Sequence, residues 1–270
     1  GLPWDFGHWR RHERTAALEA ARELMHLYGR VPVEDIDLYW RGIKTRAMQR
    51  ARAEAGEPRL GEVRSRFGEG DVEVLERRRT LTGILAVHEL KLRHRRFDGG
   101  WSEPMGRSVA LWGDAVTVLP YDPGRDRLLV IEQFRAGPAA RGDRCPWCVE
   151  VVAGLLDGDE SPEACARREA EEEAGVALGR MSEIAGYYTT GGFSGEKMTA
   201  FLGEADLPHE GGFHGLAAEH EDIRAMVLSF DAAMRAVADG AVNTGPALVS
   251  VLWLAAHREA LRAQWGAAGA

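Results

Sequence analysis

The sequence contains no long hydrophobic run and no excess of basic charge, and each absence excludes a class of protein. No apolar stretch approaches the roughly 20 residues that span a bilayer, and the first residues lack the basic and then apolar pattern of a secretory signal. Lys and Arg number 34 against 42 Asp and Glu, and a net charge of -8 argues against a general nucleic-acid binder. We therefore expect a cytoplasmic protein without membrane or nucleic-acid partners.

Cysteine is also scarce, with only Cys145, Cys148 and Cys165 in the chain. Cys145 and Cys148 have the spacing of a redox motif, but they precede a predicted strand rather than the start of a helix. A zinc site would need a second such pair, and the sequence has none. Reduced thiols are therefore the expectation, with a redox or metal role as the alternative.

The chain of 270 residues is long enough for one large domain, or for a medium domain with an extension. Apolar residues at helical spacing predict helices over 13–28 and 35–55, and Gly56-Glu57-Pro58 is expected to end the second helix. We predict a helical N-terminal extension over 1–70 and a main domain over 71–270. The first residue is Gly1 rather than methionine, as expected of a trimmed chain or a segment of a longer one.

Beyond residue 71 the pattern changes to short apolar segments separated by turns, which predicts strands. The predicted strands cover 72–75, 81–91, 92–96, 114–119, 127–132, 147–152, 183–188, 198–204 and 223–228. Turns are predicted at 97–100 and 120–125, and helices over 163–174, 231–238 and 246–264. Strands interrupted by a helix and followed by two more predict an α/β protein with a mixed sheet between helices.

The most informative segment is 154–176, GLLDGDESPEACARREAEEEAGV. Ser161 is a suitable N-cap, Pro162 suits the first helical position, and Gly175 suits the stop. On the predicted helix Glu169 lies three and four residues before Glu172 and Glu173, so the three carboxylates share a face.

Crowded carboxylates repel one another and attract hard cations such as magnesium, which prefers oxygen ligands. Arg168 and Glu172 form a pair four residues apart that could orient this cluster. A solvated acidic helix face is the alternative, and it suits Glu163 and Glu171 better than the other three glutamates.

The spacing of Gly154, Glu160, Arg168-Glu169, Glu172-Glu173 and Gly175 resembles a complete Nudix box. This box is the signature of hydrolases that split a nucleoside diphosphate linked to another moiety. Residues 71–266 further resemble the ADP-ribose pyrophosphatase branch, including its tellurite-resistance subgroup. The segments that carry this likeness are 90–99, 118–123, 131–135, 146–147, 150–154, 214–217 and 221–224. The resemblance implies the α/β/α sandwich of Nudix proteins.

The resemblance also implies roles for individual residues. The carbonyl of Ala153 and the carboxylates of Glu169 and Glu173 would hold metal ions. Glu172 would be a further ligand or a catalytic neighbour of the metals, oriented by Arg168.

Outside the box, Glu196 stands in the glycine-rich segment 191–197, where the family has a mobile-loop glutamate that positions or deprotonates the attacking water. Arg107, Arg135 and Gly154 would contact substrate. Surface or loop positions without a catalytic role are the alternatives for Arg135 and Glu196.

Three positions depart from the family pattern. Gly191 stands where a proline often marks ADP-ribose specificity, and Ser108 replaces a glutamate beside Arg107. Ile84 or Leu85 stands where relatives stack an aromatic ring on adenine. These differences leave hydrolysis intact but concern the pocket for the base.

The implied reaction is hydrolysis of the pyrophosphate in ADP-ribose, or a related nucleotide sugar, to AMP and ribose 5-phosphate. Mg²⁺ is the expected cofactor, with Mn²⁺ as a substitute. The alternatives are another nucleoside diphosphate derivative, a dinucleoside polyphosphate, or a non-catalytic ADP-ribose sensor. Family members dimerise by exchanging N-terminal strands, so a homodimer with residues 72–100 at its interface is expected.

Overall fold

The computed structural model describes residues 5–7, 9, 13–56, 63, 65–158, 160–216 and 220–266. The chain divides into two compact units. The first comprises Gly1–Asp114 with Asp157–Asp159 and Thr190–Glu196, and the second comprises the remaining residues. Within the described part, every helix is too short or too polar to cross a membrane.

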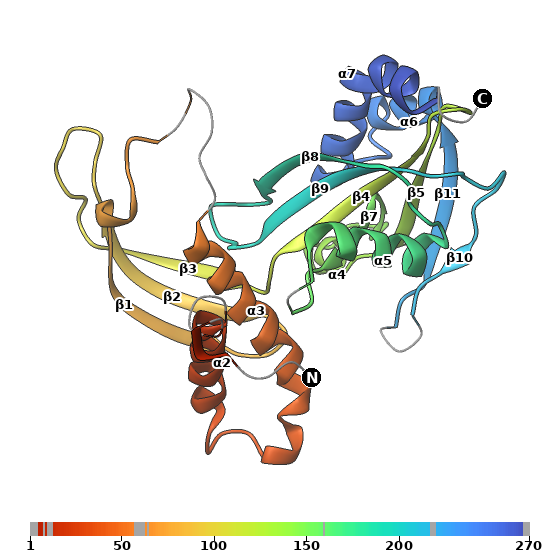
Figure 1. Cartoon of the computed structure of the whole chain (residues 1–270). Coiled ribbons are helices and arrows are strands. Elements are labelled where there is room, and N and C mark those ends of the chain that lie inside the picture. Colours follow the sequence, from red (N-terminus) through yellow and green to blue (C-terminus); the bar gives the residue numbers. More distant parts are fainter. Residues whose placement is uncertain are drawn as a thin grey trace. The chain divides into compact units, whose positions relative to one another are not determined.

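In the longer described stretches of the first unit, two long helices stand beside an antiparallel sheet of three strands (Figure 1). Its elements are α2 (Arg14–Leu27), a 3-10 turn (Val33–Asp35), α3 (Asp37–Ala55), a second 3-10 turn (Glu69–Asp71), β1 (Val72–Leu81), β2 (Ala86–His94) and β3 (Met105–Leu111). The two helices that the apolar spacing predicts are both present. Gly56, with φ of 68°, follows the end of α3, while Glu57 and Pro58 lie outside the described residues.

Two predictions for this region were wrong. The residues between Leu81 and Ala86 form a bend, so 81–91 is not one strand. Residues 92–94 continue β2, which ends at His94, so 92–96 is not a strand of its own. β3 was not predicted, because Gly106, Arg107 and Ser108 interrupt its apolar pattern. Its extended form is supported by pairing with β2 along its whole length, a long-range interaction that a local pattern does not contain.

The second unit is built on a mixed sheet, as predicted, and its described residues form eight strands. The strands are β4 (Ala115–Asp122), β5 (Arg127–Phe134), β6 (Trp147–Glu150), β7 (Val152–Leu155), β8 (Met181–Tyr188), β9 (Lys197–Glu204), β10 (Phe213–His214) and β11 (Ile223–Ser229). The order is β10-β11-β5-β4-β9-β8, with β6 paired to β5 and β7 to β4. β4 and β9 are parallel and the other pairs are antiparallel. The segment 147–152, predicted as one strand, is divided at Val151 between β6 and β7.

Helices cover both faces of this sheet, which confirms the predicted sandwich (Figure 1). They are α5 (Pro162–Ala174) on one face, and α6 (Phe230–Ala238) and α7 (Gly245–Gly266) on the other. A short helix that was not predicted, α4 (Ala136–Arg141), follows β5. Val116 and Val118 of β4 pack in the core that contains α5 residues. Leu119 and Tyr121 pack in the core that contains α6 and α7 residues. Alternate residues of one central strand therefore serve opposite cores.

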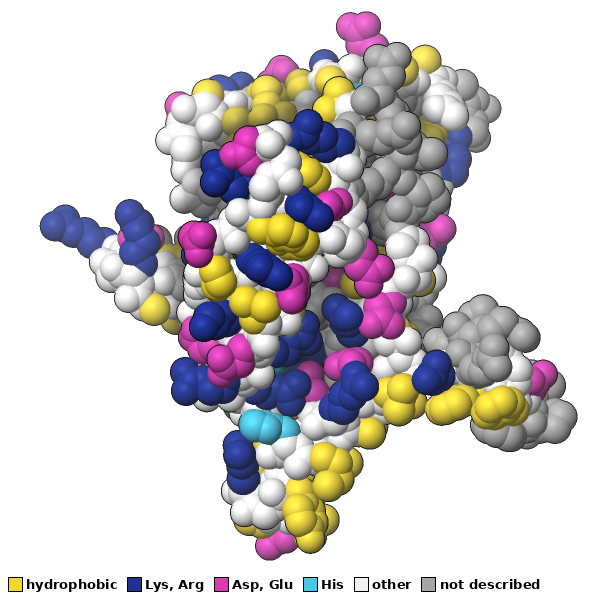
Figure 2. Space-filling view, turned by 90° about the vertical axis from the view of Figure 1, so that its left-hand side faces the viewer, with side chains coloured by type: hydrophobic (Ala, Val, Ile, Leu, Met, Phe, Trp, Pro, Cys, Tyr) yellow, Lys and Arg dark blue, Asp and Glu magenta, His cyan; other side chains and the backbone are white. Residues whose placement is uncertain are grey.

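The described surface shows charges of both signs. On the face drawn in Figure 2, Lys and Arg side chains are interspersed with Asp and Glu, and hydrophobic groups lie between them. This face therefore presents mixed charge rather than the continuous basic field that nucleic acids favour.

Candidate functional site

Helix α5 begins and ends as its sequence predicts. The Oγ of Ser161 accepts a hydrogen bond of 3.2 Å from the Ala164 amide, and Pro162 occupies the first turn. Gly175 ends the helix in the left-handed conformation, with φ of 65°. These end signals fix which residues of α5 face β7, the strand that carries Ala153 and Gly154.

Glu173 is buried against the start of the box. Glu173 is only 3% exposed, and its Oε2 accepts a hydrogen bond of 2.9 Å from the amide of Ala153. Burial raises the pKa of this carboxyl to about 8, although the Ala153 amide opposes the shift. The nearby carboxylates of Glu169 and Glu221 raise the pKa further.

Glu169 lies over the backbone of Gly154. A β-carbon placed on Gly154 would lie 1.8 Å from Oε1 of Glu169, so any side chain at this position would displace that carboxylate. Burial raises the pKa of Glu169 to about 7, and Arg168 counteracts part of that shift.

Arg168 ties the acids of the box together. Its Nη1 donates to Oε1 of Glu169 at 2.7 Å and to Oε2 of Glu172 at 3.0 Å. Its Nε and Nη2 each donate to Glu160 at 3.1 Å. Bonding to Glu160 is the largest cause that raises the pKa of Arg168. The sequence spacing predicted the pair with Glu172 but gave no role to Glu160.

The residues around Ala153 and Gly154 fit a divalent cation. The buried Glu173 and the largely buried Glu169, both with raised pKa values, meet at this backbone, and a cation would favour their charged forms. Among the described residues, no three acidic, histidine or cysteine side chains form a group that could hold an ion by themselves. Backbone carbonyl, water and phosphate oxygens would therefore complete the shell, as is usual for magnesium.

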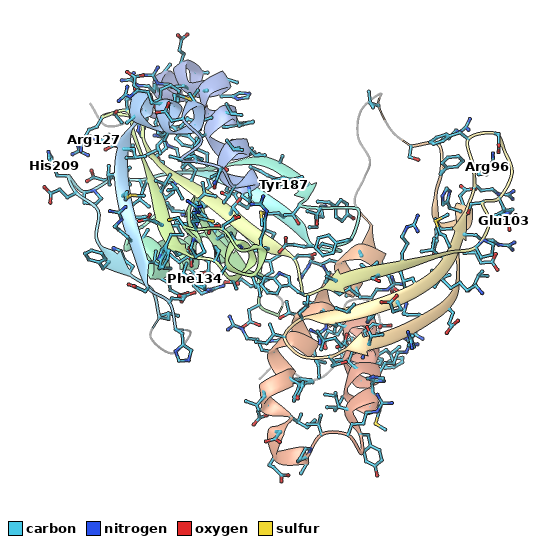
Figure 3. All side chains as sticks on the ribbon, turned by 180° about the vertical axis from the view of Figure 1, so that it is seen from behind. Arg96, Glu103, Arg127, Phe134, Tyr187 and His209 are labelled. Carbon is cyan, nitrogen blue, oxygen red and sulfur yellow. The ribbon has the colours of Figure 1, made fainter. Side chains whose placement is uncertain are left out.

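Arg135 follows β5 in the same unit and pairs with Glu150. Its Nε and Nη2 donate to Oε2 of Glu150 at 2.8 and 2.6 Å. Beside it, Phe134 (labelled in Figure 3) makes an edge contact with Trp147 at 5.6 Å between ring centroids. Glu150 and this half-exposed aromatic pair were not among the predicted site residues.

Arg107 and Glu196 belong to the first unit. Arg107 is exposed on β3, where Nη1 donates to the carbonyl of Gly106 at 2.8 Å. Its neighbour Ser108 donates to Oε1 of Glu89 at 2.9 Å. Oε1 of Glu196 accepts a hydrogen bond of 2.8 Å from the indole of Trp112, a partner that the sequence did not suggest.

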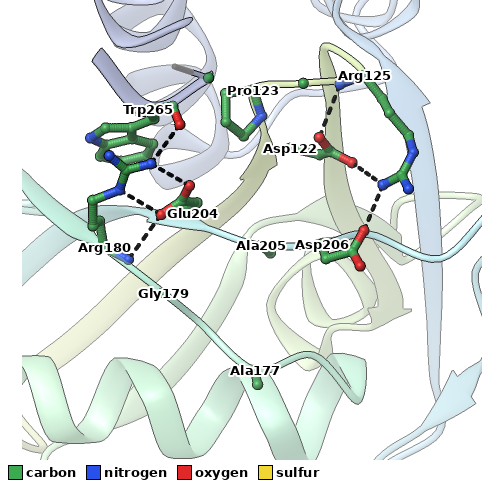
Figure 4. A pocket seen from close by; sticks show the side chains of 12 residues that line it. Asp122, Pro123, Arg125, Ala177, Gly179, Arg180, Glu204, Ala205, Asp206 and Trp265 are labelled. Carbon is green, nitrogen blue, oxygen red and sulfur yellow. Dashed lines mark hydrogen bonds and ion pairs between the residues drawn. The ribbon is translucent and has the colours of Figure 1, made fainter. Parts of the chain in front are cut away.

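A large cavity of about 910 Å³ in the second unit contains none of the predicted site residues (Figure 4). It lies at the Asp122 end of β4, whereas the box residues Ala153 and Gly154 pair near the other end of that strand. Its arginines are already paired within the fold, Arg125 with Asp122 and Arg180 with Glu204. We therefore do not assign this cavity to the proposed metal and substrate site at the box.

Comparisons with known proteins give the family of this chain. The model of the NUDIX domain matches residues 111–246. The chain is 36% identical to the ADP-ribose pyrophosphatase of Escherichia coli strain K12 over 199 residues, which cover 74% of this chain and 95% of that protein. It is 32% identical to the ADP-ribose pyrophosphatase of Haemophilus influenzae, over 74% of this chain and 93% of that protein.

One solved structure supports the fold. It is described as "Crystal structure of ADP compounds hydrolase". Its superposition on this chain gives a TM-score of 0.55 at 18% sequence identity, and the match covers 72% of this chain and 96% of that one.

Proposed function

The chain belongs to the Nudix family of hydrolases, in its ADP-ribose pyrophosphatase branch, and on that premise we propose that it hydrolyses ADP-ribose to AMP and ribose 5-phosphate with Mg²⁺. The observation that carries this proposal is the meeting of Glu169 and Glu173 at the Ala153–Gly154 backbone. Two points remain predictions: that the chain belongs to the tellurite-resistance subgroup, and that a domain boundary lies near residue 70.

The residues of the box supply charge and position. Glu169, Glu173 and the carbonyl of Ala153 would hold the cations, with Glu172 as a further ligand or catalytic neighbour. Bound cations would neutralise the diphosphate and lower the pKa of a water. Arg168 donates to both Glu169 and Glu172, and its positive charge reduces the repulsion between the two carboxylates.

The remaining assignments concern substrate and water. Arg135 would exchange part of its pairing with Glu150 for a substrate phosphate, because guanidinium binds both oxyanions in the same way. Arg107 and the Gly154 backbone would contact the nucleotide. Glu196 would orient the attacking water, so that catalysis rests on positioning and charge stabilisation.

A homodimer is part of this proposal. β1 is exposed along almost its whole length, and its apolar side chains Val72, Val74, Leu75 and Leu81 are between 43% and 52% exposed. Apolar residues on an exposed strand suit a protein interface.

Initial hydrolysis rates for ADP-ribose, ADP-glucose, GDP-mannose and diadenosine polyphosphates, each with Mg²⁺ or with chelator, test the function. We expect ADP-ribose to be the best substrate and chelator to abolish turnover. A faster rate with another compound would reassign the substrate. Tight ADP-ribose binding without turnover in Mg²⁺ or Mn²⁺ would identify a sensor instead.

A further inference from the structure

Helix α3 lies before residues 111–246, which match the NUDIX domain. It nevertheless contacts two segments within that range. Lys44 of α3 lies 3.5 Å from Asp157 in the loop of the box. Gln49 of α3 donates to the carbonyl of Gly195 at 2.8 Å, immediately before Glu196. The helical extension is therefore attached to the loop that carries the proposed catalytic glutamate.

Gln49 is the centre of this attachment. Its side chain is buried, and its Nε2 lies within 3.2 Å of the Gly113 carbonyl, Oδ1 of Asp114 and the Gly195 carbonyl. Arg52, one turn further along α3, donates to the other carboxylate oxygen of Asp114 at 2.6 Å. One amide thus links α3, the end of the β3 segment and the segment 190–196.

The segment 190–196 is also fixed to β3 by its backbone. The amide of Ala110 donates to the carbonyl of Phe193 at 2.8 Å, and the amide of Gly195 donates to the carbonyl of Ala110 at 3.0 Å. Leu111 lies so close that a β-carbon on Gly195 would be 2.5 Å from its Cδ2. Together with the bond from Trp112, these contacts hold both the backbone and the carboxylate of Glu196.

We infer that Gln49 is a positioning residue for the reaction, which holds the segment 190–196 on α3 and β3 so that Glu196 is ordered before substrate binds. The inference rests on the proposed role of Glu196. A catalytic loop that is free must lose conformational entropy when it reaches the reactive arrangement, whereas a loop that is already bound has lost it on folding. The contact therefore acts on turnover more than on substrate affinity.

Gln49→Leu keeps most of the side-chain volume and removes the amide, so it isolates this contact. Arg50→Gln is the matched control, because Arg50 is the next residue of α3 and makes an exposed pair with Glu54. Trp112→Phe is a second variant, which keeps a ring but removes the indole donor at a half-exposed position. Each variant is measured for kcat, KM, melting temperature and amide hydrogen exchange over 190–196 and over α5.

We expect Gln49→Leu to lower kcat by about ten- to a hundred-fold, the range for a misplaced catalytic group, with KM changed less than threefold. In Gln49→Leu, amide exchange should rise in 190–196 but not in α5. Arg50→Gln should change neither kcat nor amide exchange in 190–196. Trp112→Phe should lower kcat in the same direction even if Gln49→Leu does not fold. Glu196→Gln combined with Gln49→Leu should be no slower than Glu196→Gln alone, because both changes remove the same function.

An unchanged kcat in a folded Gln49→Leu protein would overturn the inference, as would unchanged exchange in 190–196 or a rise in kcat. Failure of the proposed function would look different. In that case Glu196→Gln would retain native turnover, or the native protein would not hydrolyse ADP-ribose.

Discussion

Oε1 of Glu169 occupies the space that a β-carbon on Gly154 would require, at a separation of 1.8 Å. The Glu169 side chain is only 14% exposed and pairs with Arg168 at 2.7 Å, and an added β-carbon would disturb that pair. Gly154→Ala should therefore displace Glu169 and lower kcat/KM by on the order of a hundred-fold, with a lower melting temperature from overpacking. Gly137→Ala is the control, since nothing lies within 4 Å of its added β-carbon. Native activity of Gly154→Ala would show that Glu169 is not needed at this position.

Removing the charge of Glu169 or of Glu173 should stop turnover without unfolding the protein. Glu169→Gln and Glu173→Gln keep the shape of the side chain but lose a charged ligand, and we expect kcat to fall by on the order of a thousand-fold. Glu171→Gln, on the exposed side of the same helix, should retain activity. Turnover at saturating Mg²⁺ measures the loss of activity, and circular dichroism shows whether each variant is folded. Near-native kcat in Glu169→Gln and Glu173→Gln would remove these acids from the metal site.

The raised pKa values of Glu169 and Glu173, about 7 and about 8, predict how stability varies with pH in the absence of metal. In the unfolded chain both groups ionise near their ordinary value of 4.5. Because the folded state holds these protons more tightly, its stability is highest below that pH and falls as pH rises through 7 and 8.

Melting temperatures with chelator should therefore decrease between pH 5 and pH 8.5, and Mg²⁺ should raise the melting temperature more at pH 8.5 than at pH 5. Glu173→Gln should flatten the decrease. An equal effect of Mg²⁺ at both pH values would argue against binding to these carboxyls.

The box helix could be predicted closely from sequence because its signals are local. Ser161, Pro162 and Gly175 determine both ends of α5, and the nearly continuous apolar runs of β4 and β5 indicate strands buried on both faces. β3 could not be predicted in this way, since its extended form depends on β2. The same limit applies to the site.

Spacing along a helix could predict the pairing of Arg168 with Glu172. The contacts of Gln49 with Gly195 and of Trp112 with Glu196 join residues 146 and 84 positions apart. No periodicity in a single sequence carries such separations.

The exposed strand β1 predicts a homodimer. Val74→Glu should place a charge in the proposed interface and shift the protein toward monomer, because burying an unpaired carboxylate is costly. Leu252→Glu is the control, since Leu252 is 48% exposed on α7 and Val74 is 44% exposed on β1. Light scattering at micromolar concentration measures the mass. A native protein that is monomeric and fully active would exclude the dimer.

ADP-ribose should be the best substrate, yet discrimination against other bases should be weak. Ile84 is 62% exposed on the bend between β1 and β2. We expect Ile84 or Leu85 to stand where relatives stack a ring, and an aliphatic side chain there offers only apolar contact. Stacking of a base on an aromatic ring is worth roughly 1–3 kcal/mol, so Ile84→Phe should lower KM for ADP-ribose at least about fivefold and leave kcat nearly unchanged. Val33→Phe is the control at another exposed position.

The comparison requires KM and kcat for ADP-ribose and for GDP- and UDP-linked sugars in both variants. Thousand-fold preference for adenine in the native protein would mean that another ring already stacks on the base. Phe97 and Trp101 are less suited to that role, because Phe97 contacts Phe67 at 5.1 Å and Trp101 is covered by Arg93 and Arg95. Phe193, 59% exposed in the same segment as Glu196, would then be the residue to change, and loss of adenine preference in Phe193→Leu would identify it as the stacking ring.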